Sequence, residues 1–188
     1  MVVLNTPGGN TAAAAELTMS LLMALARNLP AACDSLKKGA WERKKFGDGM
    51  ELKGKTVGVI GLGQIGRSVA KHCQSLSMAT LGYDPMMTKE AITAAGIVPA
   101  TLEDMWAKCD IITLHTPLTP DTKNLISAKT LGKMKKGVII VNAARGGIVN
   151  EADLLVALNS GQVRGAALDV FEVEPPPASA RALIEHPS

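Results

Sequence analysis

Aromatic side chains are scarce in this sequence, at 3% of 188 residues, so aliphatic and methionine side chains must build the core. Cysteine is also rare. Cys33, Cys73 and Cys109 lie far apart and form no CxxC pair, so neither a disulfide framework nor a zinc site is indicated. Thiols that stay reduced are typical of cytosolic proteins. We therefore expect a cytoplasmic location and no bound metal.

A membrane span and a signal peptide are both lacking. The most apolar stretch, residues 12–26, contains Glu16, Thr18 and Ser20, and it is shorter than the roughly 20 apolar residues that cross a bilayer. No lysine or arginine precedes Arg27, whereas a signal peptide starts with positive charge. A net charge of only +3 does not point to nucleic acid. The sequence thus predicts neither a membrane nor a nucleic-acid partner.

Apolar stretches alternate with helical patterns from residue 56 onward. The β-rich runs are 56–60, 79–83, 110–114, 138–141 and 163–168. The helical or mixed segments between them lie near 64–76, 88–95, 101–108, 127–134 and 151–159. This alternation predicts an α/β protein with a doubly wound, mainly parallel sheet that is covered by helices on both faces, as in the Rossmann dinucleotide-binding fold.

The first fifty residues follow a different pattern. Residues 11–27 predict a helix, whose apolar face carries Leu17, Leu21, Ala24 and Leu25. A second short helix is expected to end near Lys38, and residues 39–55 are irregular. A chain of this length fits one well-buried domain. We predict a single domain over 1–188, with a helical arm and irregular segment at 1–50 and a Rossmann core at 51–188.

A glycine motif, "GLGQIG", follows the first strand and opens a helix. Gly61 allows the tight turn, Gly63 lets the backbone approach a pyrophosphate, and Gly66 lets helix and strand pack closely. The amides around Gln64 and Ile65 then point at the phosphates from the helix N-terminus. The other interpretation is a glycine-rich turn without a ligand.

An acid ends the next strand. Asp84 follows Gly66 by 18 residues, close to the spacing expected for the residue that binds the adenosine ribose. Its charge would repel a 2′-phosphate, and Pro85 rather than a basic residue follows it. The motif therefore predicts NAD, in preference to NADP, as the cofactor. Without a ligand, Asp84 would be an ordinary turn residue.

Polar residues follow the remaining strands, at the edge where ligands bind in such sheets. They are His115, Thr116 and Pro117 after one strand, Arg145 after the next, and Asp169, Glu172 and Glu174 after the last. Arg145 has small neighbours on both sides, Ala143 and Ala144 before it and two glycines after it, which indicates close approach of backbone and cofactor. Its planar guanidinium can bind a 2-keto or 2-hydroxy carboxylate through two hydrogen bonds.

These motifs resemble one family. "GLGQIG", "YDP", "HTPLTPDT", "VNAARGGIVNEADLL" and "GAALDVFEVEPPP" stand in the order found in the NAD-binding domain of the D-isomer-specific 2-hydroxyacid dehydrogenases, and they span residues 1–188. The resemblance implies that Arg145 is the catalytic arginine and that Glu174 pairs with the catalytic histidine. It also implies that Asp169 lies near the nicotinamide. His115, Thr116, Pro117, Ala143 and Ala144 would line the cofactor.

The sequence departs from the family pattern near its end. The family's catalytic histidine follows a proline, whereas His186 precedes one in "IEHPS". No substrate domain is recognised either. The resemblance therefore implies a nucleotide-binding domain that lacks the catalytic histidine and is inactive alone.

The stretch "GAWERKKF" narrows the resemblance to members that oxidise 3-phospho-D-glycerate to 3-phosphohydroxypyruvate, the first step of the phosphorylated route to serine. Other 2-hydroxyacids, namely glycerate, glyoxylate or lactate, stay open as substrates. A non-enzymatic NAD-sensing module like the corepressors of this fold also stays open. In this family the segment matching residues 11–27 helps to form a dimer, so we expect a homodimer, with a higher oligomer open.

Two features have several interpretations. His115 is either a catalytic acid or, as we prefer, a residue that lines the cofactor edge. The basic cluster of Lys37, Lys38, Arg43, Lys44 and Lys45 is either a solvated face, a nucleic-acid surface, or a rim that attracts a phosphorylated substrate. We prefer the solvated face because Glu42 and Asp48 are interspersed.

Overall fold

Six parallel strands form one sheet in the order β3-β2-β1-β4-β5-β6. The structure is a computed structural model that describes residues 8–188, and the start of the predicted arm, residues 1–7, lies outside it. The strands are β1 (Thr56–Ile60), β2 (Ala79–Tyr83), β3 (Val98–Pro99), β4 (Ile111–Leu114), β5 (Val138–Asn142) and β6 (Val163–Leu168). This order is that of the Rossmann fold, so the predicted fold class is confirmed.

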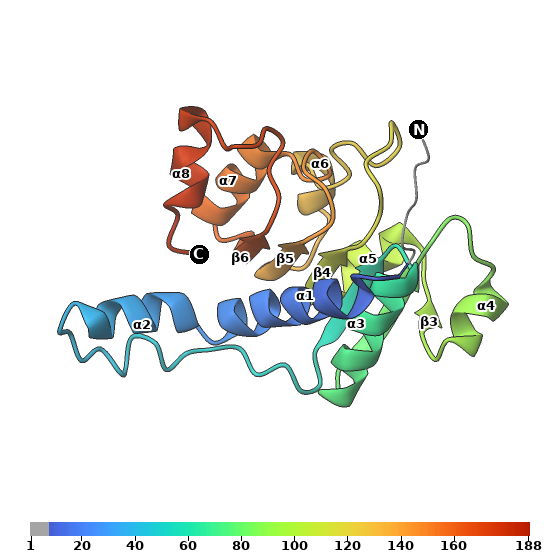
Figure 1. Cartoon of the computed structure of the whole chain (residues 1–188), viewed down its shortest axis with the longest axis horizontal. Helices are drawn as coiled ribbons and strands as arrows, with labels where there is room; N and C mark the ends of the chain where they lie inside the picture. The colour runs from blue at the N-terminus through green and yellow to red at the C-terminus, as the bar shows by residue number, and fades with distance from the viewer. Residues whose placement is uncertain (1–7) are drawn as a thin grey trace.

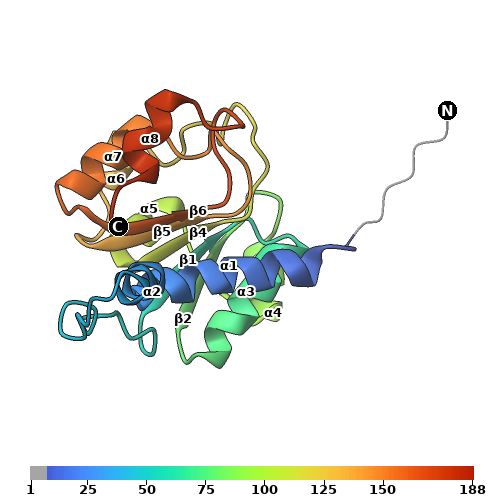
Figure 2. The same cartoon turned by 60° about the vertical axis from the view of Figure 1, so that its left-hand side comes forward.

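Helices cover both faces of the sheet (Figures 1 and 2). The helices of the described residues are α1 (Thr11–Ala26), α2 (Leu29–Lys37), α3 (Gln64–Ser75), α4 (Lys89–Ala94), α5 (Leu102–Lys108), α6 (Ala128–Leu131), α7 (Glu151–Asn159), the 3-10 turn η1 (Ala178–Ala180) and α8 (Arg181–Ile184). Helices α1, α3 and α4 pack on one face, and α5 to α8 pack on the other. Strand β3 and the C-terminal elements η1 and α8 are not among the predicted segments.

Each central strand contributes to both halves of the core. Ile111 of β4 packs with α1 and α3, whereas Ile112 and Leu114 pack with α5 and α7. In β5, Ile139 packs on the side of α1 and α3, and Ile140 packs on the side of α5 and α7. This follows from the two-residue period of a strand. Because both faces are covered, these strands are apolar throughout rather than alternating, which is why they stand out in the sequence.

Helix α1 buries a different face from the one predicted. The buried residues are Ala15, Thr18, Met19, Leu22 and Ala26, whereas Leu17 is 41% exposed. Thr18 can be buried because its hydroxyl donates to the carbonyl of Ala14 at 2.8 Å. Since α1 is apolar nearly all round, its sequence periodicity does not fix which side meets the sheet. The predicted face is instead left partly open.

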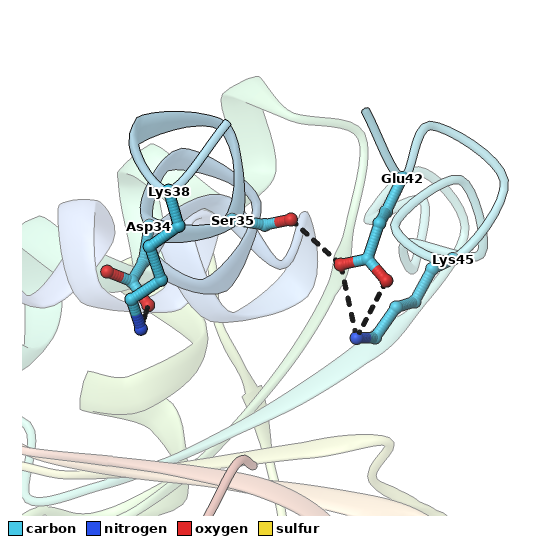
Figure 3. A network of polar contacts seen from close by, with 5 residues as sticks. All are labelled: Asp34, Ser35, Lys38, Glu42 and Lys45. Carbon is cyan, nitrogen blue, oxygen red and sulfur yellow. Dashed lines mark hydrogen bonds and ion pairs between the residues drawn. The ribbon is translucent and has the colours of Figure 1, made fainter. Parts of the chain in front are cut away.

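The segment between Ala26 and Met50 projects from the body of the protein, as Figures 1 and 2 show. We call residues 27–49 the projecting segment. Its helix α2 buries no side chain. Within it, Glu42 accepts hydrogen bonds from Ser35 at 2.8 Å and from Lys45 at 3.2 Å (Figure 3).

Ion pairs within the projecting segment engage part of the basic cluster. Lys38 pairs with Asp34 at 2.6 Å and Lys45 pairs with Glu42, so two of the five basic residues have acidic partners (Figure 3). This local compensation supports the interpretation of a solvated face. Because the side chains are exposed to water and to screening by salt, each pair contributes little to stability.

Candidate functional site

The glycine loop between β1 and α3 has the geometry that its sequence predicts. Gly61 has a φ of +91°, and a Cβ there would collide with the carbonyl oxygen of His115. A Cβ on Gly66 would collide with the carbonyl oxygen of Gly61. By contrast, a Cβ on Gly63 would meet no atom within 4 Å. Gly61 and Gly66 are therefore required by the fold, whereas Gly63 leaves open space above the loop.

Helix α3 begins at this loop with Gly63 as its N-cap, and no side chain caps it. The first amides of a helix have no partner within the helix, so those near Gln64 and Ile65 form a place for an anion. The side-chain oxygen of Gln64 accepts a hydrogen bond from the Thr11 hydroxyl at 3.1 Å, which ties the start of α1 to the loop.

Asp84 connects the end of β2 to the glycine loop. One carboxylate oxygen accepts from the amide of Leu62 at 2.8 Å, and the other accepts from the amide of Met86 at 2.8 Å. A carboxylate oxygen has more than one acceptor position, so both remain able to accept from ribose hydroxyls. The sequence predicts the position of Asp84 but not its bond to the loop.

His115, at the end of β4, points its ring into the protein. Nε2 lies 2.9 Å from the Thr113 hydroxyl. Burial lowers the pKa of His115 to about 4. The ring is therefore neutral near pH 7, and its Nε2 is occupied. These properties fit a residue that lines the site better than a proton donor. Of the following residues, Thr116 is half-buried like His115, and Pro117 is exposed.

A buried asparagine shapes the loop after β5. Asn142 is 1% exposed, and its side chain accepts from the amide of Ala144 at 3.1 Å and donates to the carbonyl of Arg145 at 2.9 Å. Ala143 and Ala144 are half-buried, whereas Arg145 is exposed and donates to the carbonyl of Ala144 at 2.6 Å. Sequence reasoning missed Asn142, although a polar residue ending an apolar strand was a signal for it.

The glycine after Arg145 lets two loops meet. A Cβ on Gly146 would collide with the carbonyl oxygen of Phe171, in the loop that follows β6. In that loop the amide of Phe171 donates to the Glu174 carboxylate at 3.1 Å, and the amide of Glu172 donates to the Glu151 carboxylate at 2.6 Å. Of the small neighbours of Arg145, Gly146 is thus explained by the close approach of the Phe171 backbone.

The strand register brings most of the predicted site residues to one edge. Ile60 pairs with Leu114, Leu114 with Asn142, and Asn142 with Leu168, so the four strands end in line. The residues that directly follow these strands are Gly61, His115, Ala143 and Asp169. Asp169 is exposed there. His186 lies elsewhere, in a hollow between β6 and α8 that Leu168 and Leu183 also line.

The residues of this edge fit a dinucleotide. The uncapped start of α3 and the open space at Gly63 suit a pyrophosphate, and the Asp84 carboxylate suits a ribose. Residues 19–188 match the family model described as D-isomer specific 2-hydroxyacid dehydrogenase, NAD binding domain. The chain belongs to this family. NAD is accordingly the cofactor of this dehydrogenase domain.

Curated relatives in the family are similar over nearly the whole chain. The D-3-phosphoglycerate dehydrogenase of Homo sapiens is 54% identical over 186 residues, which is 99% of this chain and 34% of the relative. That of Bacillus subtilis is 46% identical over 187 residues, covering 100% of this chain and 35% of the relative. The chain thus spans about a third of the length of the curated relatives that it matches.

Solved structures that are similar in sequence have the same fold. The pyruvate reductase of Chlamydomonas reinhardtii superposes with a TM-score of 0.90 at 32% identity, covering 100% of this chain and 60% of that one. An NAD-dependent formate dehydrogenase from Staphylococcus aureus in complex with NAD gives a TM-score of 0.83 at 34% identity, covering 96% of this chain and 52% of that one. Among residues 8–188, none of the helices has the length and apolarity needed to cross a membrane.

Proposed function

We propose that this chain is the NAD-binding domain of an enzyme that oxidises 3-phospho-D-glycerate to 3-phosphohydroxypyruvate, the first step of the phosphorylated route to serine. The observation that carries the chemistry is Arg145, an exposed guanidinium on the loop that follows β5 at the edge where the glycine loop lies. The choice of substrate is supported by the names of relatives that are 46–54% identical over nearly the whole chain.

The cofactor is held by the residues of the sheet edge. Gly63, Gln64 and Ile65 donate amides to the pyrophosphate, and Asp84 accepts from the adenosine ribose. The other residues that line it are Gly61, Gly66, His115, Thr116, Pro117, Ala143, Ala144, Arg145 and Asp169. When bound, the nicotinamide supplies the hydride chemistry. Asp169 is exposed at the end of β6, where its carboxylate can accept from the carboxamide.

Arg145 binds the substrate carboxylate and orients the carbon that reacts. A guanidinium offers two parallel N–H donors that match a carboxylate, whereas an ammonium acts as a single point charge. Glu174 is exposed and is bonded to the amide of Phe171. In this proposal it orients an imidazole and stabilises its protonated form, which raises the pKa of that general base.

The imidazole that Glu174 serves is neither His115 nor His186. His115 is half-buried, desolvation of its ring lowers its pKa to about 4, and its Nε2 is bonded to Thr113. The Nδ1 of His186 accepts from the amide of Ser188 at 3.1 Å, in a hollow away from the glycine loop. The 188 residues alone should therefore bind NADH but give no turnover.

We further propose a homodimer in the cytoplasm, with the open face of α1 and the projecting segment at the interface. On the open face of α1, Leu17 is 41% exposed, and Trp41 of the projecting segment is 79% exposed. Such apolar exposure supports a protein contact. The three cysteines, Cys33, Cys73 and Cys109, are free thiols, which supports a reducing compartment.

The function is tested with a chimera in which these residues replace the matching segment of the Bacillus subtilis relative. Oxidation of 3-phosphoglycerate at a kcat/KM well above that for glycerate or lactate is expected. Preferential turnover of another 2-hydroxyacid would refute the proposed substrate. Normal folding and NADH binding with no turnover of any 2-hydroxyacid, together with NAD-dependent binding of a protein, would favour a corepressor-like module instead.

A further inference from the structure

Leu62 in the glycine loop is held by side chains from two directions. Its amide donates to the Asp84 carboxylate at 2.8 Å, and its carbonyl accepts from Nη1 of Arg67 at 3.0 Å. Its own side chain is fully buried in the core beside the sheet. Leu62 is thus held by its amide, its carbonyl and its side chain. Both of its neighbours are glycines, which have the greatest backbone freedom.

The Arg67 guanidinium bonds to the backbone rather than to an acidic side chain. It is exposed on the first turn of α3, and no ion pair of residues 8–188 includes it. Its guanidinium instead donates to a backbone carbonyl five residues earlier. A hydrogen bond from a charged donor is stronger than one between neutral groups, so this contact restrains the loop firmly.

The restraint reaches the neighbouring amide through the planarity of the peptide bond. The carbonyl of Leu62 and the N–H of Gly63 belong to one trans peptide, so they point in opposite directions and turn together. By fixing the carbonyl, Arg67 fixes the direction of the Gly63 N–H. Gly63 is the N-cap of α3 and borders the open space of the loop.

We propose that Arg67 is a positioning residue for cofactor binding, which acts through the Leu62–Gly63 peptide and sets the Gly63 amide toward the pyrophosphate. The proposal rests on the NAD site described above. Asp84 restrains the preceding peptide in the same manner, so the ribose-binding acid and Arg67 together hold two consecutive peptide planes. Arg67 itself need not touch the phosphates.

The test compares three variants of the 188-residue chain by fluorescence titration. Arg67→Met removes the donors but keeps the stem, and Arg67→Lys restores one donor. Lys71→Met is the control, since it removes a positive charge from an exposed position one turn later on α3. The loss of the single bond in Arg67→Met should weaken binding of NADH and of ADP by about five- to tenfold each. Adenosine, which has no pyrophosphate, should bind unchanged.

Further readouts separate this role from two others. The Arg67→Lys variant should recover most of the lost affinity, and Lys71→Met should bind NADH normally. The melting temperature of Arg67→Met and the salt dependence of its ADP binding should match those of the unmodified chain. A lower melting temperature with equal loss for adenosine would indicate a structural role and overturn the proposal.

A weaker salt dependence in Arg67→Met would mean that the guanidinium contacts the phosphates directly, which would also overturn it. Unchanged affinity of Arg67→Met for NADH and ADP would also overturn the proposal. If the unmodified chain itself bound no NADH, the cofactor site would be refuted and the role of Arg67 with it. That result is distinguishable from a failure of the Arg67 proposal alone, because it is measured on the unmodified chain without the variants.

Discussion

The amide of Asp169 donates a hydrogen bond to the carbonyl of Asn142 at 2.9 Å. The side chain of Asn142 in turn holds the carbonyl of Arg145 at 2.9 Å. The buried Asn142 therefore links the loops after β5 and β6, and it fixes the backbone from which the Arg145 side chain extends. The guanidinium itself is exposed and can move to a substrate without disturbing the sheet.

Arg145 should matter for catalysis far more than for cofactor affinity. In the chimera described above, Arg145→Lys loses the two-point grip on the carboxylate. The kcat/KM for 3-phosphoglycerate should therefore fall by about 100-fold or more, while the Kd for NADH changes by less than about twofold. Arg181→Lys, at an exposed position on α8, is the matched control. A parallel loss of NADH affinity would contradict this division of roles.

Alanine substitutions at two glycines of the loop should affect different properties, the stability of the fold at Gly66 and the binding of NADH at Gly63. In Gly66→Ala the new methyl group meets the carbonyl of Gly61, which should cost about 1–3 kcal/mol and lower the melting temperature by several degrees. In Gly63→Ala the space is open, so the melting temperature should stay the same while NADH binding is lost. Calorimetry and titration measure the two effects. Normal NADH affinity in Gly63→Ala would show that no pyrophosphate approaches there.

Asp84→Ala should weaken NADH binding by about tenfold or more and should narrow the gap between NADH and NADPH. Removal of the carboxylate ends the repulsion of a 2′-phosphate, and it also frees the amide of Leu62. Part of the loss will therefore come from the loop and will be seen with both cofactors. Glu185→Ala, at the exposed C-cap of α8, serves as the control. Equal affinity of the unmodified protein for both cofactors would refute the assignment.

Stability should fall between pH 6.5 and pH 4 because of His115. The unfolded state binds a proton near pH 6.5, whereas burial keeps the folded state neutral until about pH 4. The unfolded state thus holds more protons in this window, so acidification favours unfolding by at most about 3 kcal/mol. Urea denaturation of His115→Gln should show a flatter pH profile. The same slope in both proteins would mean that other groups cause it.

The proposed dimer should dissociate when the exposed apolar residues are made polar. Trp41→Ser combined with Leu17→Ser should give a monomer in sedimentation experiments at tens of micromolar, with little change in melting temperature, because both side chains are exposed in the monomer. The unmodified chain should sediment as a dimer under the same conditions. A monomeric unmodified chain whose α1 amides resist hydrogen exchange would count against the interface.

The sheet could be predicted because covered parallel strands are continuous apolar runs. Strand β3 was missed because it consists of only Val98 and Pro99, and Val98 is 58% exposed. The prediction of which face of α1 is buried was wrong, because a helix that is apolar nearly all round carries no clear periodicity. Helix α8 has only four residues and no amphipathic repeat, so its sequence offers no signal.

The positions of the candidate site residues could be predicted where a residue directly follows a strand, and their roles stay predictions. The glycines and Asp84 meet in the structure at the positions that their spacing predicts. The bonds from Asp84 and Arg67 to Leu62 were not predictable, because a hydrogen bond to the backbone depends on loop geometry that no residue type specifies. The hydrogen-bond partner of Glu174 is likewise visible only in the fold, where the amide of Phe171 donates to it.

The projecting segment leaves and rejoins the body at nearly one point, since the amide of Met50 donates to the carbonyl of Ala26 at 2.7 Å. Apart from the bond that Arg164 of β6 donates to the Asp48 carbonyl at 2.6 Å, insertions, deletions or substitutions between these residues should therefore leave the register of the sheet and the nucleotide loop unchanged. After a gene duplication, one copy can change the surface of this segment while its cofactor site stays under unchanged selection. This surface and the cofactor site are thus free to evolve at different rates in the same small domain.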